Sequence, residues 1–376
     1  YQGHQMKYDL VNIHTEHANI WHLDLLDEVE QERYVLEIVP ALQQYWQNRG
    51  FRPQVIEIVT RAVNNETHPR KLRGRGMVEL ALMISTTGQI ELTESLCKRA
   101  IATASDILYV HVLALQVLYR TAMQHGDYAR AYDLLKQVLD LEPQRASSHD
   151  PQIDYRFVGN HIGMGLVSTE MGKIEDARLH FEIAMNGFTN LNEPLQKAQA
   201  RNNLALLELR EGNYSVASVH FQEVISVFET TGHDTMIMIA KANLAKADIM
   251  LGDYPTAFVN LREAMSVAVR IKRATSIVYQ LETFIHMAFL MNQHAIAAQL
   301  YGFMCHRSEQ SNIAFSPPTV IQMKTYAAQM RTSLGERFEG IVNLGSKMSL
   351  DSAVTLAHTL AAYLDLPDTQ AEPSSE

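Results

Sequence analysis

The sequence predicts an all-α protein, a solenoid of about seven helix pairs closed by further helices at its C-terminal end. Two observations carry this prediction. A turn motif recurs about every 40 residues, and the segments between the turns have apolar side chains at helical spacing and are rich in residues that helices prefer. The composition agrees, because 47% hydrophobic and only 20% charged residues indicate a packed chain.

The turn motif has a glycine at its centre. It falls at residues 50, 88, 126, 172, 212 and 252, and a seventh copy has Asn292 at the glycine position. Successive copies are therefore 38, 38, 46, 40, 40 and 40 residues apart. A repeat of this length is typical of stacked helix pairs, in which each pair buries its apolar face against the next.

The residues of the turn favour the end of one helix and the start of another. Gly212 and Gly252 follow apolar-periodic segments and suit the left-handed residue that terminates a helix. Asp253 can cap the following helix, and Pro255 then lies in its first turn, where a missing N–H is harmless.

Each second helix is predicted to pack through a small residue followed by a bulky one. The small residue allows two helices to approach closely, and the bulky one fills the gap to the next pair. The small residues are Ala131, Ala217 and Ala257, and the bulky ones are Leu135, Phe221 and Leu261.

The predicted domain organisation has four parts. Residues 1–30 form an entry helix or linker, of which 1–6 resemble a linker or cloning remnant, and residues 31–308 form the repeats. Capping helices occupy 309–366, with Gly340 and Gly345 expected to join helices at 319–334 and 349–364. Residues 367–376 are expected to be disordered.

Composition narrows the classes of function. A net charge of −10 argues against a general nucleic-acid binder. Cys97 and Cys305 are the only cysteines, which excludes a disulfide framework and a four-cysteine zinc site and fits a reducing, cytoplasmic setting. No apolar run approaches the roughly 18 residues of a membrane-spanning helix.

Two segments resemble the tetratricopeptide repeat. They are Asn202-Asn203-Leu204-Ala205 through Phe221, and Ala242-Asn243-Leu244-Ala245 through Leu261. The usual period is about 34 residues, so the helices of this chain are expected to be longer by about three residues each. Elongated repeats of this kind resemble those of bacterial regulatory proteins more than those of chaperone cofactors.

Six segments near the two ends of the chain form an ordered series. They are Glu16–Ile20, Tyr45–Gly50, Ala297–Gly302, Pro317–Pro318, Leu334–Phe338 and Gly345–Ala353. This series resembles the sensor region of bacterial STAND-type signal-transduction ATPases, which combine an effector domain, a nucleotide switch and a repeat sensor. The resemblance implies a sensor that binds an effector in a concave groove and regulates the nucleotide switch and transcription.

No phosphate-binding loop of the form G-x-x-x-x-G-K-[ST] occurs in the chain. The richest glycine cluster, Gly159, Gly163 and Gly165, is expected to serve close helix packing instead. If the family resemblance holds, this chain is the sensor portion alone. The alternative is a free-standing tetratricopeptide peptide receptor or scaffold, similar to quorum-sensing receptors.

Catalytic and metal sites are not expected, nor is a cofactor. His14, His17 and His22 lie close together with Glu16 between them, but the cluster lacks a thiolate, and surface or packing histidines are the default interpretation. No G-x-S-x-G motif is present. Buried structural roles are expected for both cysteines, so the chain is predicted not to be an enzyme.

The binding hypothesis rests on the first helix of each pair, which lines the concave surface of such a stack. Asn203 and Asn243 each lie nine residues before a turn glycine, a position that grips extended peptides in tetratricopeptide proteins. The alternative is that both amides bond to a neighbouring helix. Positive charge on this face comes from Arg120, Lys246 and His286, and Tyr279, Glu282 and Thr283 extend it.

A solvated polar face is the alternative for the charged set. The expected partner is an effector that is a small molecule, a peptide or a protein, with no direct contact to nucleic acid or membrane. Exposed end repeats also allow self-association.

Overall fold

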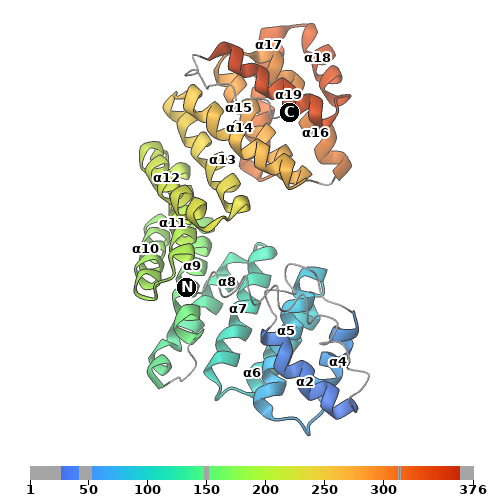
Figure 1. Cartoon of the computed structure of the whole chain (residues 1–376), viewed down its shortest axis with the longest axis vertical. Coiled ribbons are helices and arrows are strands. Elements are labelled where there is room, and N and C mark those ends of the chain that lie inside the picture. The colour runs from blue at the N-terminus through green and yellow to red at the C-terminus, as the bar shows by residue number, and fades with distance from the viewer. Residues whose placement is uncertain (1–26, 42–52, 148–151, 312, 314, 365–376) are drawn as a thin grey trace, which may run out of the picture. The chain divides into compact units, whose positions relative to one another are not determined.

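The computed structural model describes residues 27–41, 53–147, 152–311, 313 and 315–364, and every regular element in these ranges is helical (Figure 1). The chain divides into two compact units, 1–193 and 194–376, which are described separately below. The turn at Gly50, the histidines near the N-terminus, the possible linker at 1–6 and the C-terminal tail lie outside the described residues. The four-part domain organisation stays a prediction.

Unit 1 contains four helix pairs in its described residues. The helices are α2 (Glu28–Ala41), α4 (Pro53–Asn64), α5 (Arg70–Ile84), α6 (Ile90–Thr103), α7 (Leu108–Gln124), α8 (Tyr128–Asp140), α9 (Gln152–Glu170) and α10 (Ile174–Asn190). Short 3-10 helices follow α5 and α8, at Ser85–Thr87 and Glu142–Ser147. The first helices of neighbouring pairs contact each other, from α2 to α5, α5 to α7 and α7 to α9.

Unit 2 contains three further pairs and the C-terminal helices. The helices are α11 (Pro194–Arg210), α12 (Tyr214–Thr231), α13 (Asp234–Leu251), α14 (Tyr254–Arg270), α15 (Ala274–Leu290), α16 (His294–Ser311), α17 (Pro317–Leu334), α18 (Arg337–Ser346), α19 (Leu350–His358) and the 3-10 helix η4 (Thr359–Tyr363). Here α11 contacts α13, and α13 contacts α15. The all-α repeat fold predicted from the sequence is confirmed.

The turn residues adopt the left-handed conformation that the motif predicts. Their φ angles are 79° at Gly88, 73° at Gly126, 72° at Gly172, 82° at Gly212, 82° at Gly252 and 58° at Asn292. Asp253 accepts a hydrogen bond from the backbone N–H of Thr256, and Pro255 lies in the first turn of α14 as expected. Local chemistry therefore fixes where the helices of a pair meet.

A second set of left-handed residues lies between pairs, and the sequence analysis did not anticipate it. Asn192, Gly232 and Lys272 have φ angles of 56°, 69° and 53°. The backbone N–H of each donates to the carbonyl oxygen three residues earlier, at the end of the preceding helix, with N···O distances of 3.1, 3.4 and 3.0 Å. The connection between pairs in this part of the chain thus repeats with the same 40-residue spacing as the connection within pairs.

The predicted small and bulky residues form the core. Ala131, Ala217 and Ala257 are fully buried, and so are Leu135, Phe221 and Leu261. Burial of a side chain as large as Phe221 contributes about 2–3 kcal/mol to stability. The alternation of small and large side chains therefore sets how closely successive helices pack.

The glycines of α9 have two different roles. A Cβ at Gly165 would collide with the edge of the Phe181 ring, 2.4 Å from its Cε1 atom. One at Gly163 would lie 3.1 Å from both Leu135 and the Tyr119 hydroxyl. These two glycines serve close packing, as expected. Gly159 does not, because a Cβ there would meet no atom within 4 Å.

The C-terminal helices correct one expectation. The segment with Gly340 and Gly345 is not a simple linker but the helix α18, which packs on α16. A Cβ at Gly345 would collide with the backbone carbonyl of Gln299, and one at Gly302 with that of Val342. Gly302 and Gly345 are therefore the residues that let the backbones of α16 and α18 touch.

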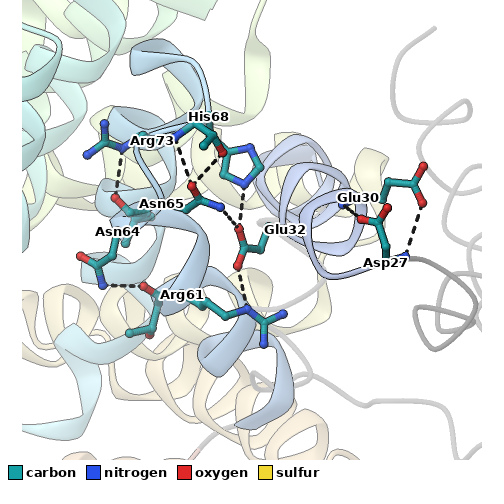
Figure 2. A network of polar contacts seen from close by, with 11 residues as sticks. Asp27, Glu30, Glu32, Arg61, Asn64, Asn65, His68 and Arg73 are labelled. Carbon is teal, nitrogen blue, oxygen red and sulfur yellow. Dashed lines mark hydrogen bonds and ion pairs between the residues drawn. The ribbon is translucent and has the colours of Figure 1, made fainter.

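A network of polar contacts ties together the start of unit 1 (Figure 2). The Glu32 carboxylate of α2 accepts hydrogen bonds from Arg61 Nε at 2.7 Å and Asn65 Nδ2 at 2.8 Å. His68 Nε2 lies 2.9 Å from the same carboxylate and is itself buried. Burial alone would raise the pKa of Glu32, but the hydrogen bonds from Asn65, His68 and Arg61 outweigh it and hold the pKa below its ordinary value.

No helix within the described ranges is long and apolar enough to span a membrane.

Candidate functional site

Asn203 and Asn243 lie at equivalent places on α11 and α13, the first helices of successive pairs in unit 2. Both side chains are half-buried. Neither forms a side-chain hydrogen bond with any described residue, so the alternative of bonding to a neighbouring helix has no support there. The adjacent Asn202 is buried, and its Oδ1 also lacks a hydrogen-bond partner among the described residues. Asn203 and Asn243 therefore carry amide donors and acceptors that no described residue uses.

Lys246 and Glu282 join α13 to α15. Lys246 Nζ donates to Glu282 Oε2 at 3.1 Å, and Thr283 Oγ1 lies 3.5 Å from the same oxygen. The Glu282 side chain is almost fully buried, whereas that of Lys246 is about one-third exposed. The positive charge predicted for this face is thus already matched by a neighbouring carboxylate, and a ligand would have to compete for it.

His286 completes this group one turn further along α15. It is buried, and burial lowers its pKa, with the nearby Lys246 acting in the same direction and Glu282 opposing. The neutral imidazole is therefore favoured near neutral pH, and it offers a hydrogen bond rather than a charge.

Helix α17 adds aromatic and amide residues beside His286 that the repeat pattern does not predict. The rings of His286 and Tyr326 lie 5.5 Å apart, and Tyr326 stacks on Phe289 at 4.0 Å. Gln322 Nε2 donates to the Tyr326 hydroxyl at 2.9 Å. Gln322 and Tyr326 belong to α17, a helix that was predicted only to cap the stack. The repeat pattern therefore gave no signal for them.

Tyr279 lies nearer the start of α15 and is 45% exposed. Its ring meets that of Phe315 edge-on, with 5.3 Å between centroids. It presents an aromatic surface on the helix that carries Glu282 and His286.

Arg120 belongs to unit 1, whereas the other predicted residues belong to unit 2. It is exposed near the end of α7, with its guanidinium 6.0 Å from the centroid of the Tyr119 ring.

A buried polar cluster in unit 1 escaped the sequence analysis. It consists of Arg75 and Glu79 on α5, Tyr109 and Gln116 on α7, and Arg156 and Asn160 on α9. One signal was available, because Glu79 lies nine residues before Gly88, the position that Asn203 holds before Gly212. We call these six residues the unit 1 polar cluster.

The described residues include neither a metal-binding cluster nor a thiol with a lowered pKa. No group of three histidine, cysteine, aspartate or glutamate side chains is placed there to hold a metal ion. Cys97 is buried as expected, and burial raises the pKa of its thiol to about 12. Cys305 is partly buried, and burial raises its pKa as well. Both thiols are thus poor nucleophiles at neutral pH.

Several solved structures share this fold. A Rap protein complexed with competence and sporulation factor has a TM-score of 0.54 at 11% sequence identity, covering 89% of this chain and 99% of that one. Aspartyl phosphate phosphatase F from Bacillus subtilis has a TM-score of 0.55 at 13% identity, covering 93% and 89%. No protein-family model and no curated protein matches the sequence.

A third similar structure is a STAND protein with a tetratricopeptide repeat sensor from Pyrococcus horikoshii. Its TM-score is 0.55 at 14% identity, and the match covers 88% of this chain and 54% of that one. This chain thus spans about half the length of that protein. At such identities the likeness establishes a tetratricopeptide-like helical-repeat fold.

Proposed function

We propose that this chain is a non-enzymatic protein-interaction and effector-sensing module, and that it regulates the nucleotide switch and transcriptional output of a STAND-type bacterial regulator in the cytoplasm. The observation that carries the proposal is the pair Asn203 and Asn243. These half-buried amides recur on successive first helices and bond to no described residue. Such amides can both donate to and accept from the backbone of an extended peptide.

We expect the neighbouring groups to contact the side chains of the same ligand. Tyr279 offers an exposed ring, and His286 offers a hydrogen bond without charge. The ion pair of Lys246 with Glu282 links α13 to α15. A ligand that competes for Lys246 would weaken that link, so its binding would favour a different arrangement of the two helix pairs. The fold shared with the STAND sensor supports this role.

The test compares wild-type protein with the double variant Asn203→Ala and Asn243→Ala. Native mass spectrometry of the purified wild-type chain is expected to show a co-purified effector, and the double variant is expected to lose it while unfolding as cooperatively. Asn343→Ala, an exposed asparagine on α18 of the same unit, is the matched control and should retain the effector. Equal retention by wild type and double variant would remove the amides from the site.

A free-standing peptide receptor is the second candidate. It is favoured by the match to the Rap protein, which covers 99% of that chain. The coding sequence upstream separates the two candidates. A phosphate-binding loop and a winged-helix region there would support the STAND regulator, and an independent start codon would support the receptor.

A further inference from the structure

The unit 1 polar cluster brings two arginines to one aromatic ring. The guanidinium carbon of Arg75 lies 4.9 Å from the centroid of the Tyr109 ring, and that of Arg156 lies 4.6 Å from it. No ion pair within 4 Å neutralises either arginine among the described residues. Glu79 is the one carboxyl group of the cluster, and both arginines act to lower its pKa, but it forms no ion pair with either. Two like charges held this close, in a partly buried place, still favour a further negative group.

Hydrogen bonds fix Arg156 in this position. Its Nη1 donates to Gln116 Oε1 at 3.1 Å, and its Nη2 donates to the Tyr109 hydroxyl at 2.8 Å. Gln116 Nε2 in turn donates to Asn160 Oδ1 at 2.9 Å. The network links α7 to α9 and holds the guanidinium in place without using all of its donors.

Four buried polar atoms of the cluster have no hydrogen-bond partner among the described residues. Three are donors, Arg75 Nε, Arg156 Nε and Asn160 Nδ2, and one is an acceptor, Glu79 Oε1. Asn160 is 1% exposed and Glu79 is 2% exposed. Each unpaired buried group costs about 1–3 kcal/mol, so the cluster is built at the expense of stability.

The backbone of α9 is uncovered at one position between residues of the cluster. Gly159 lies between Arg156 and Asn160 on α9, and a Cβ there would meet no atom within 4 Å. Farther along the same helix Gly163 and Gly165 are packed against side chains. The helix is thus bare at Gly159, and a small molecule can approach the backbone there.

The unpaired atoms define a complementary ligand. Two cationic donors and an amide donor call for an anionic acceptor, and arginine suits the planar geometry of a carboxylate. The carboxyl oxygen of Glu79 calls for a donor, best a cationic one. We propose that the unit 1 polar cluster binds a small zwitterion, an α-amino acid or a close analogue, with its carboxylate on Arg75 and Arg156 and its ammonium on Glu79.

Burial favours a free small molecule over the end of a longer chain, because both Glu79 and Asn160 are almost inaccessible from outside. The electrostatics of Glu79 agree. Burial raises its pKa to about 7, although Arg75 and Arg156 act to lower it. A bound ammonium would supply the partner that the carboxylate lacks. This site shares no residue with the amide pair of unit 2, so either proposal can fail without the other.

Isothermal titration calorimetry on the full chain tests the proposal. The probes are the twenty free L-amino acids, followed by the N-acetyl and the carboxamide derivatives of whichever binds. One amino acid is expected to bind, and removing its charge at either end should weaken binding at least about tenfold, as expected for charge-assisted hydrogen bonds in a buried site.

Two variants and a control locate the binding in the cluster. Arg75→Gln and Arg156→Gln should each weaken binding at least about tenfold. Arg99→Gln removes the same charge from an exposed position on α6 of the same unit and should bind like wild type. Circular dichroism checks that each variant folds, and the derivative series in wild type does not depend on any variant.

Three results would overturn the proposal. One is that no amino acid binds, which would leave a hydrated polar core. A second is equal binding of an amino acid and its N-acetyl derivative, which would point to a simple carboxylate or a peptide end. The third is undiminished binding by folded Arg75→Gln and Arg156→Gln proteins.

Discussion

Two glutamates of unit 1 have almost the same small solvent exposure, but their pKa values shift in opposite directions. Glu32 is 3% exposed and Glu79 is 2% exposed. Glu32 has Arg61, Asn65 and His68 around its carboxylate, and its pKa is lowered (Figure 2). Glu79 has an oxygen without a partner, and burial raises its pKa to about 7.

The difference teaches that burial of a charged group says little about function until its partners are counted. Glu32 stabilises the packing of α2 on α4, because every group it faces is paired. Near Glu79, the Nε atoms of Arg75 and Arg156 have no hydrogen-bond partner among the described residues. The contact between α16 and α18 in unit 2 is a second closely packed region, because Gly302 and Gly345 let the two backbones touch. Substitution should therefore change stability differently where all groups are paired or packed and where polar groups lack partners.

Gly345→Ala should cause the largest loss of stability, about 3 kcal/mol, because its methyl group would collide with the Gln299 carbonyl and backbone cannot yield as a side chain can. Chemical denaturation monitored by circular dichroism measures it. Gly340→Ala on the same helix is the control. A Cβ there meets nothing within 4 Å, so alanine should stabilise α18 by up to about 1 kcal/mol. Equal effects of the two would refute the close approach of α16 and α18.

Glu32→Ala should cost about 2 kcal/mol in the same measurement, because it strands buried His68 while Arg61 remains accessible to water. Glu37→Ala on the same helix removes an exposed ion pair with Arg33 and should change stability by less than about 0.5 kcal/mol. A loss from Glu32→Ala no larger than that from Glu37→Ala would mean that the network of Figure 2 does not stabilise the fold.

Much of the fold was predictable because it is decided by neighbours in the sequence. The left-handed turns at Gly212 and Gly252 and the cap at Asp253 depend only on residues within one turn. Helix α18 was missed because Gly340 and Gly345 locally favour a break. Only the distant Gln299 explains why a glycine is needed at 345.

The unit 1 polar cluster was harder to predict for the same reason. Arg75 and Glu79 are separated from Arg156 and Asn160 by two helix pairs' worth of sequence, and only the packing of α5, α7 and α9 brings them together. The repeat pattern marks which helices line one face. It does not say which of their polar side chains converge or which are left without partners.

Glu79→Gln tests the unit 1 polar cluster. It should raise the stability of the protein, whereas Glu32→Ala should lower it. The pKa of Glu79 rises from its ordinary value of 4.5 to about 7 on folding. The folded protein therefore keeps a proton that the unfolded chain loses between these values. The contribution of Glu79 to stability is complete below pH 4.5, declines as the pH rises and is lost above about pH 7.

Glutamine cannot ionise, so the variant should escape this decline. At pH 8 it should be more stable than wild type by up to about 3 kcal/mol, and at pH 4.5 the two should be nearly equal. Urea denaturation at both pH values measures the difference. If the difference is the same at both, the ionisation of Glu79 is not coupled to folding. If the variant is less stable at pH 8, the Glu79 carboxylate contributes to the fold as Glu32 does, and the contrast between the two regions disappears.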